Sequence, residues 1–235
     1  MRDPAQQAWE AFLAGGRTQA NEMRDFPEWH RGRERYTLWA IDLAPCTELQ
    51  APLGAARQAL EGLLLPGYQR ELHLTLHVCG FPAEGRVSED DFDGDQFSAQ
   101  VAALQAARLR PFNLTIGGLG SFATAPFLAV GDGDAMLPRL RAALAAAGEE
   151  WRDTPYVPHA TVGIYNGSHP AAEVARRRET FPMPQAVSIP VRRIALMAYA
   201  SRVIGGPLQT LCEFDLADNL LLPGASLPFV LNATP

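Results

Sequence analysis

A short pattern of histidine and threonine occurs twice in this chain, as His73-Leu74-Thr75-Leu76 and as His159-Ala160-Thr161-Val162. Histidine changes its charge near neutral pH and can give or take a proton, and a threonine hydroxyl can donate a hydrogen bond to an anionic oxygen. Five histidines in 235 residues would produce a His-x-Thr triplet only about 0.2 times by chance. The repeated pattern therefore indicates a site where protons are moved beside a negative charge.

Both motifs have the alternating pattern of a β-strand. In residues 72–78 every second position is leucine or valine, so His73 and Thr75 are expected on one face of a sheet and the apolar side chains on the other. In residues 157–165 the alternation puts His159 and Thr161 on one face with Gly163 and Tyr165. Each motif is therefore predicted to present its histidine and threonine from one strand face.

The elements that must position the motifs also repeat, which is a strong signal for the fold. A predicted strand and an apolar helical stripe precede each motif, at residues 36–41 and 49–64 in the first half and at residues 126–130 and 136–147 in the second. Further strands are predicted at 112–116, 191–198 and 208–214, and further helices at 97–108 and 171–178. The predicted fold class is α/β (α+β), with two pseudo-symmetric lobes, each a β-sheet with helices, around a central groove. A pseudo-twofold axis would bring the polar faces of the motif strands together across that groove.

The motifs and their spacing resemble those of a known family. Residues 71–76 and 156–162 are similar to the two motifs of the 2H phosphoesterases, and within them of the RNA 2′,3′-cyclic phosphodiesterases, also called 2′-5′ RNA ligase-like proteins. Residues 118–122, residues 196–201 and Arg35-Tyr36 support the resemblance, which covers residues 35–216. It implies two lobes around a groove in which each His-x-Thr pair contacts a phosphate, with no cofactor and no metal.

The resemblance implies hydrolysis of a 2′,3′-cyclic phosphate, or a related 2′-linked phosphodiester, at an RNA end or on a nucleotide. One histidine takes a proton from the attacking water and the other gives a proton to the departing sugar oxygen. We assign His73 as the acid and His159 as the base, although the residues themselves leave this order open. Thr75 and Thr161 would donate hydrogen bonds to the phosphoryl oxygens.

Three further residues are candidates for substrate binding. Tyr165 could stack on a base or hydrogen-bond to the substrate, and a structural tyrosine is the alternative. Phe122 could stack on a base or pack in the core, and Arg35 could contact a phosphate or remain solvated. Many relatives carry a basic residue shortly after the second motif, where this chain has Gly163-Ile164-Tyr165. That departure puts one phosphate or nucleotide contact in doubt.

Several alternatives use the same motif residues. The substrate could be a cyclic nucleotide, an ADP-ribose cyclic phosphate or a 2′-5′ oligoadenylate, and reverse 2′-5′ RNA ligation fits the same site. A non-catalytic protein that binds RNA ends or nucleotides would use the same groove. A zinc site of His73, His77 and His159 is the chemical rival. Residues four apart on a regular strand are separated by about 13 Å, so His73 and His77 cannot share an ion, and His77 is expected farther along the groove or facing solvent.

The composition limits partners and location. A net charge of −6 argues against binding long duplex nucleic acid, which depends on neutralising many phosphates, and leaves an RNA end or a small nucleotide as the partner. Three cysteines without disulfide or metal spacing suit a reducing cytoplasm. There is no apolar run of about 18 residues and no secretory signal. We expect a cytoplasmic monomer with no membrane contact.

The repeat also predicts the domain limits. Residues 1–34 form an N-terminal extension, residues 35–216 the bilobal domain and residues 217–235 a C-terminal tail. The extension is expected to hold a short amphipathic helix with Ala8, Trp9, Phe12 and Leu13 on its apolar face. Docking of this helix on the domain is its expected role, with a lid over the groove as the alternative.

Overall fold

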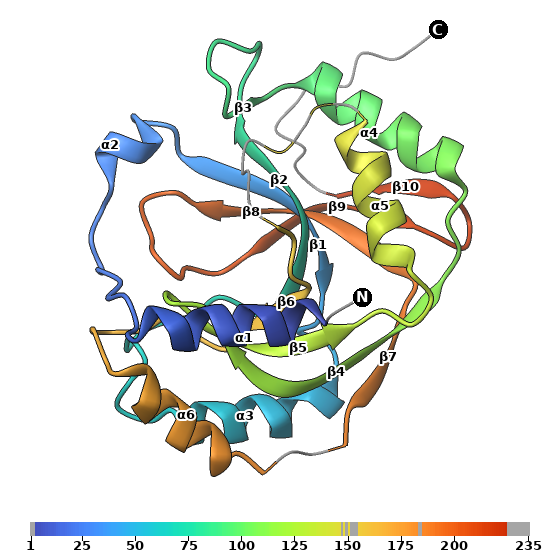
Figure 1. Ribbon diagram of the computed structural model, residues 1–235. Coiled ribbons are helices and arrows are strands. Elements are labelled where there is room, and N and C mark those ends of the chain that lie inside the picture. Colours follow the sequence, from blue (N-terminus) through green and yellow to red (C-terminus); the bar gives the residue numbers. More distant parts are fainter. Residues whose placement is uncertain (1–2, 147, 149, 151–154, 183–184, 225–235) are drawn as a thin grey trace, which may run out of the picture.

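The computed structural model describes residues 3–146, 148, 150, 155–182 and 185–224. Within this part, ten strands form a sheet in the order β10-β9-β8-β1-β2-β6-β5-β4-β7, with β3 paired to β2 (Figure 1). The strands are β1 (Arg35–Asp42), β2 (His73–Pro82), β3 (Asp91–Phe92), β4 (Phe112–Ser121), β5 (Pro126–Gly131), β6 (His159–Thr161), β7 (Val187–Val191), β8 (Arg193–Ala200), β9 (Gln209–Asp215) and β10 (Leu220–Pro223). The α/β class predicted from the sequence is confirmed.

Helices flank this sheet. They are α1 (Pro4–Gly15), α2 (Pro27–His30), α3 (Gln50–Ala59), α4 (Gly94–Ala107), α5 (Met136–Ala145) and α6 (Ala171–Glu179), and a 3-10 turn, η1 (Thr47–Leu49), leads into α3. Helices α4 and α5 pack against each other, and α5 also contacts β2 (Figure 1). The motif strand β2 is therefore supported by a helix from the second half of the chain.

The apolar stripes predicted before each motif are the buried faces of two helices. Leu53 and Ala56 are buried on α3, and Leu140 and Leu144 are buried on α5. All four belong to the same core cluster as Leu74 of the first motif. Residue 147, the last of the second predicted stripe, lies outside the described residues. Burial of these stripes fixes the apolar faces of the motif strands and leaves the opposite faces for His and Thr.

The strand order does not confirm a separate sheet for each lobe. Leu74 of β2 pairs with Ala160 of β6, so a single path of paired strands runs through both motifs. The chain also crosses between the two halves of this sheet. Strand β4 follows the first motif but pairs with β5, and β8 follows the second motif but pairs with β1. Each half of the sheet is thus completed by strands from distant parts of the chain.

The strands next to the two motifs nevertheless occupy equivalent positions. Asp42 of β1 lies opposite His73, and Ala129 of β5 lies opposite His159. The pairs β1–β2 and β5–β6 are both antiparallel, and a core-facing helix precedes the motif strand in each case. The internal repeat predicted from the sequence is therefore present around the motifs.

Helix α1 is present in the N-terminal extension, where the sequence predicted a helix. Trp9 and Phe12 are buried, whereas Leu13 is 40% exposed. The helix contacts β4 and α6, and the Arg178 guanidinium lies 4.3 Å over the Trp9 ring. The structure thus shows α1 docked on the domain.

The predicted C-terminal tail contains one further strand. Residues 220–223 form β10, which pairs with β9 and extends the sheet at one edge. Residues 225–235 lie outside the described residues. Of the helices described, none has the length and apolar character needed to cross a membrane.

Candidate active site

The two motifs lie on adjacent strands in the middle of the sheet. Because Leu74 and Ala160 are paired in antiparallel register, His73 is placed opposite Thr161 and Thr75 opposite His159. The two paired residues are fully buried, so the four polar side chains share the other face, and opposite residues have Cβ atoms about 4.5–5.5 Å apart. The structure therefore brings together all four residues predicted from the motifs.

The two imidazole rings are held in the same way. His73 Nδ1 lies 2.8 Å from the Glu71 carbonyl oxygen, and His159 Nδ1 lies 2.7 Å from the Val157 carbonyl oxygen. A carbonyl oxygen only accepts, so each Nδ1 carries the donated proton. In the neutral ring this tautomer makes Nε2 the basic nitrogen. Both histidines thus present the same nitrogen for proton transfer.

Burial changes the protonation of His73. It lowers the pKa of His73 to about 4, against the hydrogen bond to Glu71, which raises it. Arg70 and His159 lower the pKa further, and the Glu71 carboxylate raises it. His73 is therefore neutral at pH 7 in the free protein. The contribution of His159 also shows that the two histidines are electrostatic neighbours.

Two aromatic rings support His159 from the side. The Phe122 ring centroid lies 4.9 Å from that of His159 at an interplanar angle of 84°, and the Phe127 centroid lies 5.5 Å away at 61°. Phe127 is fully buried, whereas Phe122 is only partly buried. The two rings pack against the imidazole and restrict its rotation.

A cavity of about 490 Å³ opens beside Thr75 and His159. It is lined by Thr75, Val78, Phe122, Thr124, Ala125, Arg141, Glu150, Pro155, Tyr156, Val157 and His159. Its size suits a small organic group, and pockets of this kind combine apolar walls with a few polar groups. The cavity therefore adds a binding volume at the Thr75–His159 end of the four-residue cluster.

Two arginines join the halves of the site in matching positions. Arg141, on the helix before the second motif, donates to the carbonyl of Leu76, the last residue of the first motif. Arg57, on the helix before the first motif, donates from Nε to the carbonyl of Val162, the last residue of the second motif, at 3.1 Å. In each half of the repeat, the arginine of the helix before the motif thus donates to a backbone carbonyl of the other half's motif.

Further contacts fix Arg141 in place. Its Nη2 forms a 3.0 Å ion pair with Glu150, and its guanidinium lies 3.9 Å over the Tyr156 ring. The Tyr156 hydroxyl donates to the Thr75 carbonyl at 2.8 Å, and Glu150 accepts from Val78 N at 3.1 Å. The segment before the second motif is therefore tied to the strand of the first.

The chain matches the 2′-5′ RNA ligase superfamily over residues 45–202. The chain belongs to this family. The resemblance to 2H phosphoesterases found in the two motifs is therefore confirmed. A search among curated proteins finds no significant match.

Solved structures show the same fold at low sequence identity. TT0787 of Thermus thermophilus is 21% identical with a TM-score of 0.53, covering 77% of this chain and 97% of its own. E. coli LigT complexed with 3′-AMP is 19% identical with a TM-score of 0.52, covering 78% of this chain and 99% of its own. Apo E. coli LigT is 20% identical with a TM-score of 0.50, covering 78% and 98%. At these identities the similarity extends to the fold alone.

Two of the three substrate-binding candidates, Tyr165 and Arg35, are not among the residues that line the cavity at the motifs. Tyr165 is fully buried, and its hydroxyl lies 2.6 Å from Ser121 Oγ; burial raises its pKa to about 12. Strand β6 ends at Thr161, so the predicted alternation does not continue to residue 165. This placement favours the structural alternative for Tyr165. Phe122, by contrast, lines the cavity.

Arg35 lies at the far end of β1. Residue 42 of this strand is opposite His73, and seven residues of strand correspond to about 23 Å. Arg35 lines a different hollow, of about 380 Å³, together with Tyr199 and Leu208. The structure therefore does not bring Arg35 to the four motif side chains.

His77 lies in the interior instead of facing solvent. It is only 3% exposed, and burial lowers its pKa, with Glu150 raising it and Arg141 lowering it. Among the described residues, no group of three or more His, Cys, Asp or Glu side chains is arranged to hold a metal ion.

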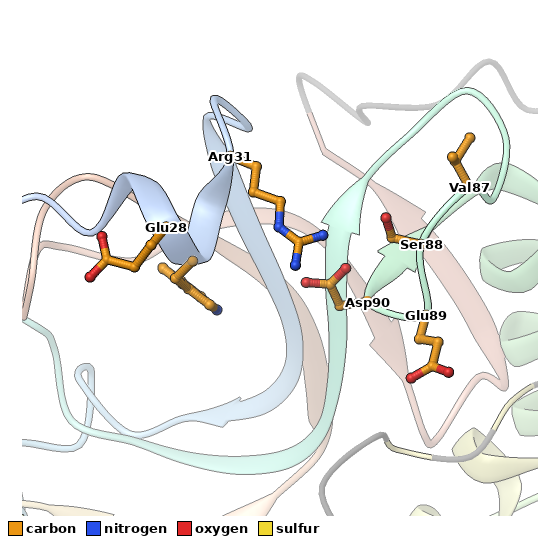
Figure 2. Close-up of a pocket in the computed structure, with 7 residues that line it drawn as sticks. Glu28, Arg31, Val87, Ser88, Glu89 and Asp90 are labelled. Atoms are coloured by element: carbon orange, nitrogen blue, oxygen red, sulfur yellow. The ribbon is translucent and has the colours of Figure 1, made fainter.

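A second hollow lies at the other end of β2. It has about 510 Å³ and lies between α2 and the loop before β3, and Figure 2 shows the side chains of Arg31 and Asp90 pointing toward one another across it. Its lining residues, 28, 29, 31 and 87–90, include no histidine. It is slightly larger than the cavity at the motifs but contains no imidazole.

Sequence reasoning did not find Arg57, Arg141 or Glu150. Their roles depend on contacts between segments far apart in the chain: Arg57 and Val162 are separated by 105 positions, and Arg141 and Leu76 by 65. One signal was available, since each arginine lies in the helix that precedes a motif.

Proposed function

We propose that this protein hydrolyses a 2′,3′-cyclic phosphate, or a related 2′-linked phosphodiester, at an RNA end or on a nucleotide. The observation that carries the proposal is the adjacent pairing of the two motif strands, which puts two histidines of the same tautomer and two threonines on one face. This arrangement provides two proton-transfer groups and two hydroxyl donors around one position. Membership of the 2′-5′ RNA ligase superfamily supports the same chemistry.

In the proposed reaction a water oxygen attacks phosphorus while His159 Nε2 takes its proton. The bond from phosphorus to one sugar oxygen breaks, and His73 Nε2 gives its proton to that oxygen. The product is a phosphate monoester with a free neighbouring hydroxyl. Thr75 and Thr161 hydroxyls donate to the non-bridging oxygens as negative charge increases on them.

The assignment of His73 as acid sets a condition on substrate binding. With its pKa near 4, His73 lacks the required proton at pH 7 in the free protein. A bound phosphate anion favours the protonated ring and raises its pKa. We therefore propose that the substrate itself brings His73 into its acidic form.

The cavity beside His159 accommodates the nucleoside in this proposal. Phe122 lines it with a partly exposed ring, and aromatic rings bind bases by stacking without selecting a particular base. Tyr165 and Arg35 have no role in the proposed site.

The direct test is hydrolysis of a short RNA with a terminal 2′,3′-cyclic phosphate in excess EDTA. Wild type should turn it over, and His73→Ala and His159→Ala should each reduce kcat at least about 1000-fold, the scale of a lost proton-transfer group. His169→Ala is the matched control, because this histidine hydrogen-bonds to Asn166 outside the site and should leave turnover unchanged. Full activity in both motif variants would refute the proposal, and binding without turnover by wild type would favour the non-catalytic alternative.

A further inference from the structure

The segment that follows α1 lies against the β4–β5 loop, residues 122–125. Gln19 N donates to the Ala123 carbonyl at 2.7 Å. The Asn21 side chain donates from Nδ2 to the Thr124 carbonyl at 2.9 Å. Two successive carbonyl groups of the loop are therefore held by residues 19–21, a part of the chain that lies outside the family match over residues 45–202.

This segment is itself fixed to the body of the protein. The Thr18 hydroxyl donates to the Gly167 carbonyl at 2.7 Å and accepts from His169 N at 2.7 Å. Asn21 donates to the Tyr165 carbonyl twice, from N at 2.9 Å and from Nδ2 at 3.1 Å. The preceding helix α1 is anchored by two buried aromatic side chains. The segment is thus a fixed support for the loop.

The supported loop forms one wall of the cavity at the motifs. Three of its residues line that cavity: Phe122, Thr124 and Ala125. The Phe122 ring packs on His159 with the ring centroids 4.9 Å apart. Residues 123–124 are exposed, and loops with few buried contacts open at a low cost in free energy. The hydrogen bonds from the segment therefore contribute much of what holds the loop, and with it the Phe122 ring, in place.

Asn21 is the position at which this support depends on side-chain chemistry. Gln19 donates through its backbone, which every residue except proline supplies, and its side chain is exposed. The Asn21 amide has two donors and meets two carbonyl groups, those of Thr124 and Tyr165. The Thr124 carbonyl also accepts from Tyr165 N at 3.1 Å, so Asn21 completes a pair of donors to this oxygen. Tyr165 takes part in these contacts through its backbone alone.

We propose that Asn21 is a positioning residue for the nucleoside wall of the cavity. By joining the Thr124 and Tyr165 carbonyl groups, it keeps the loop where the Phe122 ring lies beside His159. The nucleoside then meets a preformed stacking surface, and less ordering of the loop is needed on binding. This inference rests on the proposed function, because it takes the cavity to bind the nucleoside of the substrate. Asn21 acts through the loop and is not itself among the lining residues.

The position of Phe122 can be measured in the free protein. An aromatic ring shifts the resonances of nearby protons, so the ring protons of His159 report on Phe122. Nuclear magnetic resonance should show the His159 signal of Asn21→Ala displaced from its wild-type position toward that of Phe122→Ala, which lacks the ring. The signal is assigned by its loss in His159→Gln. Gln19→Ala is the matched control, because it removes an exposed amide from the same segment and keeps the backbone donor, and it should leave the signal unchanged.

Calorimetry tests the consequence for ligand binding. Asn21→Ala should bind adenosine 3′-phosphate about three- to tenfold more weakly than wild type, the scale of one hydrogen bond, and inorganic phosphate equally well, which also shows that the site is folded. Asn21→Asp keeps the shape but has no donor, and it should lose at least as much affinity at pH 7. In a Phe122→Ala background, Asn21→Ala should cause no further loss, because two residues that act through one contact are not additive.

Three outcomes would overturn the inference. They are a His159 signal at its wild-type position in Asn21→Ala, equal losses of affinity for inorganic phosphate and adenosine 3′-phosphate, and additive losses from Asn21→Ala and Phe122→Ala. The hydrolysis assay decides the proposed function separately. A wild type that fails to hydrolyse the cyclic phosphate, yet shows the displaced His159 signal and the selective loss in Asn21→Ala, would refute the catalytic proposal and support the positioning role of Asn21.

Discussion

Binding of a phosphate anion should raise the pKa of His73 from about 4 to near neutrality. A unit negative charge about 4 Å from the ring stabilises the imidazolium by about 4 kcal/mol at an effective dielectric constant of about 20. One pKa unit corresponds to about 1.4 kcal/mol, so the expected increase is about 3 units, to a pKa of about 7. The interaction with the bound phosphate would thus offset the cost of burying the protonated ring.

Nuclear magnetic resonance of the histidine ring protons measures this change. The His73 signal is assigned by its loss in His73→Gln, and its chemical shift is followed against pH with and without saturating adenosine 3′-phosphate. Adenosine, which has no phosphate, is the matched control and should leave the titration midpoint unchanged. A midpoint that stays near 4 with the phosphate bound would refute the acid role of His73 and would favour its use as the base.

Four other expectations follow from the described contacts. Burial holds the pKa of His73 below its unfolded value of 6.5, so the unfolded chain binds more protons than the folded chain between about pH 6.5 and pH 4. The free energy of unfolding should therefore fall by up to about 3 kcal/mol as the pH is lowered through that window. Urea unfolding of wild type and His73→Gln at both ends of the window measures this contribution. Arg141→Met removes the contacts to Leu76, Glu150 and Tyr156, and it should lower kcat by about 10- to 100-fold through displaced motif residues, with a smaller effect on KM in steady-state kinetics. Tyr165→Phe removes the hydroxyl that lies 2.6 Å from Ser121 Oγ and should reduce the free energy of unfolding by about 1 kcal/mol, measured by thermal unfolding. An altered KM in this variant would show that Tyr165 contacts the substrate. Phe122→Ala should weaken binding of adenosine 3′-phosphate by about tenfold through lost stacking and leave binding of inorganic phosphate unaffected. Equal losses of affinity for both ligands in calorimetry would contradict stacking of the base on Phe122.

Alternating apolar positions were sufficient to predict the four motif side chains. Strand alternation fixes which residues share a face, and the structure has His73 and Thr75 on one face of β2 and His159 and Thr161 on one face of β6. The helical stripes were predictable for the same reason. The apolar residues on α3 and α5 recur at helical spacing and are buried.

The pairing partner of each strand was not predictable in this way. Alternation states which face is apolar and contains no information about which strand lies beside it. The sequence therefore suggested two sheets facing each other across a groove, whereas Leu74 and Ala160 are direct neighbours in one sheet. The extent of β6 was overestimated for a related reason. Residues 157–165 alternate, but the ladder ends at Thr161, and Tyr165 then turns into the interior beside Ser121.

The arginine contacts were also outside the reach of sequence patterns. Arg57 and Arg141 are ordinary polar positions on amphipathic helices, and their importance comes from two carbonyl groups in the opposite half of the repeat. Such long side chains cover considerable distance, so the helix pattern alone does not indicate which group they meet.

The crossing of the chain between the two halves of the sheet has a consequence during biosynthesis. Strand β1 pairs on one side with β8, and Arg35 of β1 lies opposite Ala200, a separation of 165 positions. At about 5–20 residues per second, a ribosome needs roughly 8–33 s to supply the second strand after the first has been made. During that interval the edge of β1 offers its unpaired backbone groups to any other extended chain. Until residue 200 has left the ribosome, β1 therefore lacks the strand that covers this edge in the folded protein.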